Sequence, residues 1–572
     1  MRKMCRLSLA CLSLLIFTTT IRAAEGPDLL PDSTAAVIKL MAPQKTLKQL
    51  SSFADSVQEG SGGMIKGQAG MLGLGISNPT MQGVDQSRDW WAGVFLNEDD
   101  DPAVVFVIPA IDTEAMGEAL DESFTFVAHE KYGIYSDNDA AMELVQAHLE
   151  DRTSKSVASL ASEQIKSQFE GSHIAVAVNL VLVKEVYADK LEEMREQMNE
   201  GMKEAQGQML EVPGMNLDFL KDLTEKIADK IVVIVEDAEG YSNALTVTDA
   251  GINFKEVVEF TDGSRSAKYL AANPPQPATQ LSKLPSEQLF YWNAGGNMNK
   301  INEWGLSLLP KMLDMSEEDA AEWKKLSAMT KKVNYEGMSG AFSLGDLQTG
   351  LVRTIALGTA SPASQFRDAM AKAVELMDGM EISGMTQELS LEKNYEKVDG
   401  VDVDLMLTKQ TMDNDPQFGG FQAQINQFMY GGDTIETRVA FVDDTHYLQT
   451  MGGGKELMET AVKAYKNQSA DTDAVVSRDI KPLGENNFVL LMDIPTLVKQ
   501  GLSIAANAPN LPPMPFDQDS LENLEIQRSY IGVSVATKDR ACIGQLYIPV
   551  ETFQAGASLM QFFQQIQGGN AF

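Results

Sequence analysis

The chain has 572 residues, 44% of them hydrophobic, and a formal net charge of −35 from 46 basic and 81 acidic residues. A polyanion of this strength repels phosphate backbones and anionic lipid headgroups, so the composition argues against nucleic-acid binding. Cleavage of an N-terminal export signal would remove Cys5 and Cys11 and leave Cys542 alone. An intramolecular disulfide is then excluded, and stability has to come from buried apolar surface.

Residues 1–23 have the layout of a secretory signal peptide. Three basic residues precede an apolar run from Leu7 to Phe17, and small residues follow at Ala23 and Ala24. The run is too short to span a membrane, and no stretch of about 18 apolar residues follows it. We therefore expect cleavage after Ala23, export to the periplasm or the extracellular space, and no transmembrane segment in the mature chain.

The first half of the mature chain, residues 24–270, contains a clear β-hairpin pattern. The segment WWAGVFLNEDDDPAVVFVIP, residues 90–109, places apolar strands on both sides of a short acidic gap. Carboxylates are ligands that calcium prefers, so Asp99, Asp100 and Asp101 are candidate ligands of a weak calcium site. The alternative is a solvated turn, because Asp, Asn and Pro are also turn-forming residues.

Familiar catalytic and cofactor motifs are missing or incomplete in the sequence. The four histidines are far apart and only one mature cysteine remains, which argues against a zinc site. GMSGA at 337–341 and SLEK at 390–393 lack the partners of known nucleophile motifs. The glycine-rich run at 59–75 matches no phosphate-binding pattern. No cofactor is expected apart from the calcium considered above, and an enzyme is not favoured.

A methionine-rich helix is predicted at residues 191–210. Apolar residues recur there at spacings of three and four, which places them on one stripe of the helix: Leu191, Met194, Met198, Met202, Ala205 and Met209. Such a stripe is either an ordinary core-facing surface or an adaptable surface for a partner helix or an apolar ligand. Thioether binding of a cuprous ion is a third reading. The ligand-binding candidates are Met194, Met198, Met202 and Met209.

A proline-rich linker at residues 271–288 divides the mature chain almost equally, and the second half, 289–572, repeats the order of elements in the first. Four pairs of segments keep their order, including HIAVAVNLVLVKEV against NFVLLMDIPTLVKQG, in which Leu182–Lys184 match Leu497–Lys499. An insertion near 380–435 has no counterpart in the first half. The order of elements therefore predicts an internal duplication.

Short apolar runs read as strands, and helices follow hairpins rather than single strands. We expect an α+β fold with antiparallel sheets and helices packed on one face, built as two similar halves joined by the linker.

This layout of signal peptide, Leu-Pro before a short strand, and repeated strand-helix-hairpin-helix units resembles large uncharacterised secreted proteins of planctomycete-type bacteria. The resemblance implies an exported protein and supplies no site residue. Our hypothesis is an exported, soluble, non-catalytic binding or scaffolding protein whose partner is a protein or an apolar ligand. Two alternatives stay open: a carrier of an apolar ligand that uses the Met-rich helix, and a carboxylate-based hydrolase with a site between the halves.

Overall fold

The computed structural model describes residues 26–569, apart from 68–69, 98–100, 152, 161, 208–216, 297, 314, 383–384, 412–423, 508–515 and 517. The predicted signal peptide, 1–23, lies outside this range. Two compact units divide the chain: unit 1 comprises residues 1–46 and 68–186, and unit 2 comprises 47–67 and 187–572. In the part of the chain that is described, no helix is long and apolar enough to cross a membrane.

Unit 1 is built on an antiparallel sheet with the strand order β6-β1-β2-β3-β5-β4. Its strands are β1 (Ala36–Leu40), β2 (Trp90–Phe95), β3 (Ala103–Pro109), β4 (Thr125–His129), β5 (Tyr132–Ser136) and β6 (Ile174–Asn179). Its helices are η1 (Gly26–Leu29), α4 (Gly70–Gly75), α5 (Thr113–Glu118), α6 (Asp139–Glu150), α7 (Val157–Leu160), α8 (Glu163–Phe169) and α9 (Leu180–Val186). Helix α2 (Pro43–Val57) begins in unit 1 and ends in unit 2.

Strand β3 of the unit 1 sheet is buried on both faces. On β3, Val105 and Val107 belong to a core cluster that includes Val145 of α6. The alternate residue Ile108 belongs to a second cluster, which includes Met116 of α5. The antiparallel α+β class predicted from the sequence is confirmed. The sequence predicted helices on one face of the sheet, whereas α6 and α5 pack on opposite faces of β3. A strand that is apolar at successive positions has to bury both of its faces.

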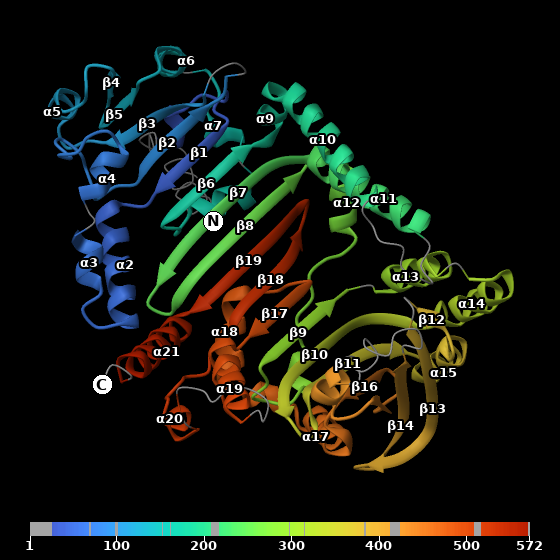
Figure 1. Ribbon diagram of the computed structural model, residues 1–572. Coiled ribbons are helices and arrows are strands. Elements are labelled where there is room, and N and C mark those ends of the chain that lie inside the picture. Colours follow the sequence, from blue (N-terminus) through green and yellow to red (C-terminus); the bar gives the residue numbers. More distant parts are fainter. Residues whose placement is uncertain are drawn as a thin grey trace, which may run out of the picture. The chain divides into compact units, whose positions relative to one another are not determined.

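Unit 2 contains a longer antiparallel sheet with the strand order β7-β8-β19-β18-β17-β9-β10-β11-β16-β15-β14-β13-β12. Figure 1 shows the neighbouring strands β8, β19, β18 and β17 side by side. The strands are β7 (Ala238–Thr248), β8 (Gly251–Phe260), β9 (Phe290–Gly295), β10 (Asn334–Asp346), β11 (Gly350–Ser361), β12 (Glu381–Ile382), β13 (Met385–Val398), β14 (Val401–Thr411), β15 (Thr434–Phe441), β16 (His446–Met451), β17 (Phe488–Met492), β18 (Ile531–Lys538) and β19 (Ala541–Pro549).

The helices of unit 2 precede and follow these strands. They are α3 (Gly62–Gly67), α10 (Ala188–Gly207), α11 (Leu217–Asp237), α12 (Arg265–Ala271), η2 (Leu281–Lys283), α13 (Asn299–Met312), α14 (Glu317–Thr330), α15 (Ala363–Met377), α17 (Gly454–Asn467), η3 (Ser469–Thr472), α18 (Ala474–Ile480), η4 (Lys481–Leu483), α19 (Ile494–Ala506), α20 (Gln518–Glu522) and α21 (Val550–Gly569).

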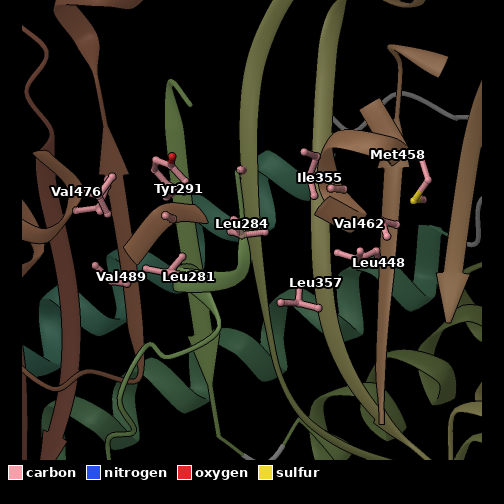
Figure 2. Packing of buried hydrophobic residues seen from close by; sticks show 14 of the residues in the cluster. Leu281, Leu284, Tyr291, Ile355, Leu357, Leu448, Met458, Val462, Val476 and Val489 are labelled. Carbon is pink, nitrogen blue, oxygen red and sulfur yellow. The ribbon is translucent and has the colours of Figure 1, made fainter. Parts of the chain in front are cut away.

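The largest core of unit 2 lies on one face of this sheet. Figure 2 shows part of the cluster, with Leu357 and Leu448 on neighbouring strands close to Val462 of α17. Leu281 and Leu284, which the sequence places in the proline-rich linker, also belong to this cluster. The linker segment is therefore packed into the core and is not a free tether.

The same strand order occurs twice along the chain. The order β4-β5-β3-β2-β1-β6 of unit 1 corresponds to β15-β16-β11-β10-β9-β17 in unit 2, strand for strand. A gene duplication as the origin of this recurrence stays a proposal. The segment predicted as an insertion supplies β12, β13 and β14, which extend the sheet beyond β15.

One predicted match between the halves is out of register by a single residue. Val178 and Met492 occupy equivalent pairing positions, and Asn179 and Asp493 follow them. Each of these two side chains accepts a hydrogen bond from the backbone N–H three residues later, at Leu182 and at Thr496 respectively. Leu182 therefore corresponds to Thr496, and the sequence match to Leu497 was wrong because it followed side-chain identity instead of the capped helix start.

Candidate functional site

The centre of the unit 2 sheet has two unlike faces. On β17, Val489 and Leu491 are 0% exposed, in the core described above. The alternate residue Phe488 is 37% exposed, and Leu490 and Met492 are half-buried. Because successive strand residues point to opposite sides, the second face is apolar but only partly covered.

The register of the sheet extends this surface over six strands, from β8 to β10. One row across the strands contains Phe254, Leu546, Val533, Leu490 and Trp292 in paired positions. Parallel rows contain Ile531, Met492, Phe290 and Phe342, and Val535, Phe488, Ala294 and Met338. We call these residues the apolar face; each of them is half-buried or exposed. A contiguous apolar surface of this kind is typical of a ligand or partner site.

Aromatic side chains lie side by side on the apolar face. The rings of Phe290 and Phe342, on β9 and β10, have centroids 5.4 Å apart. The indole of Trp292 lies over Gly340, where a Cβ atom would come within 2.3 Å of Trp292 Nε1. Glycine at this position leaves room for the ring to lie against the sheet.

Helices cover the sheet at two borders of the apolar face. At the β7–β8 border, Phe53 of α2 and Phe553 of α21 pack against Val247, with the two rings 5.3 Å apart. On β18, Thr537 donates a hydrogen bond to the backbone oxygen of Asn273, which follows α12. The apolar face thus lies between packed borders.

One carboxylate stands on this face. Glu256 of β8 is exposed and accepts hydrogen bonds from Tyr241 Oη at 3.2 Å and Asn243 Nδ2 at 3.4 Å, both on β7. It is paired across the sheet with Gly544, and a Cβ atom at Gly544 would lie 4.0 Å from Glu256 Oε2.

Several buried charges of unit 2 form a network around Arg528. Its Nη2 donates to Asp473 Oδ2 at 2.8 Å and to Tyr530 Oη at 2.7 Å, and its Nε lies 3.8 Å from Asp493 Oδ2. Burial would raise the pKa of Asp473, but the hydrogen bonds from Arg528 and from the backbone N–H of Glu287 lower it below its usual value. Burial raises the pKa of Asp493.

These carboxylates also cap helices. Asp473 accepts from two backbone N–H groups at the start of α18, and Asp493 accepts from Thr496 N at the start of α19. Asp479 is fully buried, bonded to Arg478 and to the backbone N–H of Tyr530. The helix caps and ion pairs satisfy these buried carboxylates, so a structural role is enough to explain why they are buried.

The site residues predicted from the sequence are placed as follows. Met194, Met198 and Met202 lie along α10, with side chains outside the described part, and Met209 lies outside the described residues altogether. Asp99 and Asp100 are also outside it, and Asp101 is exposed in the turn between β2 and β3. The predicted hairpin itself is confirmed by the pairing of these two strands. Among the described residues, no group of three or more His, Cys, Asp or Glu could hold a metal ion.

The apolar face was missed in the sequence, although a signal was present. FVLLM at 488–492 is apolar at every position, and FYW at 290–292 likewise. In an antiparallel sheet with one wetted side, strands alternate between apolar and polar residues. Uninterrupted apolar strands predict two apolar faces, and only the structure shows that one of them stays partly uncovered.

No protein-family model matches this chain, and no curated protein matches it. Among solved structures, crystal form III of TP0453 aligns with 12% identity and a TM-score of 0.21, covering 49% of this chain and 97% of that chain. Crystal form I of TP0453 aligns with 11% identity and a TM-score of 0.21, covering 49% and 96%. At these TM-scores the likeness establishes neither a shared fold nor a shared function.

Proposed function

We propose that this chain is an exported, non-catalytic binding protein that holds an apolar ligand on the apolar face of unit 2. The observation that carries the proposal is the contrast within β17, whose Val489 and Leu491 are fully buried while Phe488, Leu490 and Met492 are not. Leaving a wide apolar surface in contact with water is unfavourable, at about 25 cal/mol per Å². A ligand that covers this surface recovers that free energy.

This proposal places the ligand on the sheet itself and does not depend on the Met-rich helix. The carrier hypothesis placed the ligand in a groove between the Met-rich helix and the sheet, with Met194, Met198, Met202 and Met209 as candidate contacts. These four side chains lie outside the described part of the chain. The strands of the apolar face supply Trp292, Phe290 and Phe342, large rings with little conformational freedom, which suit apolar ligands. A scaffolding role that holds a protein partner on the same surface is the second candidate.

Export is part of the proposal. It is supported by the basic, apolar and small-residue pattern of residues 1–23. Expression of the full chain with its native N-terminus, followed by N-terminal sequencing of the secreted product, tests the predicted cleavage after Ala23. Recovery of an uncleaved intracellular chain would contradict export.

Binding is tested with 1-anilinonaphthalene-8-sulfonate and with N-phenyl-1-naphthylamine, a neutral probe, both of which fluoresce in apolar surroundings. We expect saturable binding of the neutral probe to the folded protein and at least about a fivefold weaker affinity after Leu490→Gln, which places a polar group at the centre of the apolar face. Ile111→Gln is the matched control, because Ile111 is 76% exposed and lies in unit 1. Equal affinities in all three proteins would overturn the proposal.

Mass spectrometry of organic extracts separates the two candidates. A carrier purified under native conditions releases an apolar molecule that the Leu490→Gln variant holds in lower amount. A scaffold releases none and instead retains a protein partner on the same surface.

A further inference from the structure

We infer that the ligand of the apolar face is an amphiphile with a cationic group, which Glu256 recognises. This inference rests on the proposed function and names the chemistry of its ligand. Glu256 is separated from Phe254 by one residue on β8, so both side chains point to the same side of the sheet. The carboxylate therefore stands on the apolar face itself, and Lys255 between them points to the opposite side.

The pairing across the strands brings the carboxylate beside the most exposed part of the apolar face. Glu256 pairs with Gly544, Gly544 with Val535, and Val535 with Phe488. Because Gly544 has no side chain, nothing on β19 stands between Glu256 and Val535 in this row. Val535 and Phe488 are 38% and 37% exposed, among the highest values on this face.

The hydrogen-bond partners of Glu256 leave its charge uncompensated. Tyr241 and Asn243 donate to Oε1 at 3.2 and 3.4 Å, and both are neutral. Within the described part of the chain, no Lys, Arg or His side chain forms an ion pair with Glu256, whereas the neighbouring acid Glu259 lies 4.0 Å from Arg540. A carboxylate that receives only neutral donors keeps its negative charge available for a charge-assisted hydrogen bond or ion pair with a cationic group of a ligand.

Apolar surroundings strengthen a charge–charge contact. When a ligand tail covers Val535 and Phe488, it excludes water from one side of Glu256 and lowers the local dielectric constant, which strengthens attraction to a bound cation. Phe488 adds an aromatic ring in the same row, and aromatic faces attract cations. An anionic headgroup would instead meet a carboxylate and a chain with a net charge of −35.

Two probes of opposite charge, each with a chain of ten carbons when the carboxylate carbon of decanoate is counted, test this inference: decyltrimethylammonium and decanoate. Isothermal titration is performed on the full mature chain below the aggregation concentration of each probe, with circular dichroism to confirm the native fold. We expect decyltrimethylammonium to bind at least about tenfold more tightly than decanoate. We expect Glu256→Gln to weaken the cationic probe about tenfold and to leave decanoate unchanged or tighter.

Glu388→Gln is the matched control. Glu388 is an exposed glutamate on β13 of the same sheet, away from the apolar face, so this variant makes the same change in net charge. If Glu388→Gln weakens the cationic probe as much as Glu256→Gln does, the preference comes from the overall charge and the inference is overturned. Equal binding of both probes by the unmodified protein also overturns it while leaving the proposed function intact. Failure of both probes, together with the neutral probe, overturns the proposed function itself.

Discussion

Trp292 lies over Gly340 on the neighbouring strand, so closely that a Cβ atom at position 340 would come within 2.3 Å of Trp292 Nε1. The contact fixes an aromatic ring at the centre of the apolar face. It also makes the position of that ring depend on the absence of a side chain at Gly340.

Gly340→Ala should therefore displace the Trp292 indole and weaken binding of the neutral apolar probe. We expect a shift in tryptophan emission that disappears in a Trp292→Phe background. Gly544→Ala is the control for the emission spectrum alone, since the nearest atoms to a Cβ there are 4.0 Å away, on Glu256, and Trp292 is not among them. Identical emission spectra for Gly340→Ala and the unmodified protein would show that the ring is held by other contacts.

Leu490 and Leu491 are adjacent residues on β17 that report on the two faces of the sheet. Leu491→Ala removes a fully buried side chain from the core, and we expect a loss of about 2–5 kcal/mol in the free energy of unfolding. Leu490→Ala removes a half-buried side chain and should cost about 1 kcal/mol. Urea unfolding measures both. Equal losses would mean that the apolar face is covered as completely as the core.

Arg367 of α15 anchors the added hairpin of β13 and β14. Its Nε donates to Asp404 Oδ2 at 2.7 Å, a second bond runs from Nη2 to Oδ1, and the Asp404 side chain is 1% exposed. Arg367→Met leaves a buried carboxylate unpaired, and we expect a loss of about 3 kcal/mol in the free energy of unfolding.

Lys397→Met is the control for this prediction. Lys397 pairs with Asp402 on the same two strands, but both side chains are more than half exposed, so no measurable change is expected. A loss after Arg367→Met as small as that after Lys397→Met would contradict a structural role for the buried pair.

The Asp473–Arg528 pair predicts a specific dependence of stability on pH. Because the pKa of folded Asp473 is below its usual value, the carboxylate stabilises the fold at every pH above the unfolded pKa of about 3.9. This contribution is lost as the pH falls through the folded pKa. The difference in unfolding free energy between the unmodified protein and Asp473→Asn should be constant from about pH 7 to 5 and should shrink below about pH 4.

Urea unfolding at pH 7, 5 and 3 checks this difference, with the exposed Asp262→Asn variant expected to match the unmodified protein throughout. Burial raises the pKa of Asp493, so this residue changes the stability with pH in the opposite direction to Asp473. Subtracting the stability of Asp473→Asn from that of the unmodified protein removes the contribution of Asp493 and isolates that of Asp473. A difference for Asp473→Asn that grows on acidification would refute the pairing.

Much of the fold could be predicted because its signals are local. The hairpin of β2 and β3 and the antiparallel α+β class follow from strand periodicity, turn residues and the order of segments. The residue-by-residue alignment of the two halves was harder to predict, as the one-residue error at Leu182 shows. Similar apolar side chains fit several alignments, while a helix cap fits only one.

The sequence by itself determined the acidic charge and strands such as Phe488–Met492 that are apolar at every position. Which side of those strands is buried depends on what packs there. Tertiary packing placed the Leu357 and Leu448 core on one side and left Trp292 and Phe488 partly in contact with water on the other. It also brought Glu256 into line with Val535, residues far apart in the chain whose proximity exists only through strand pairing.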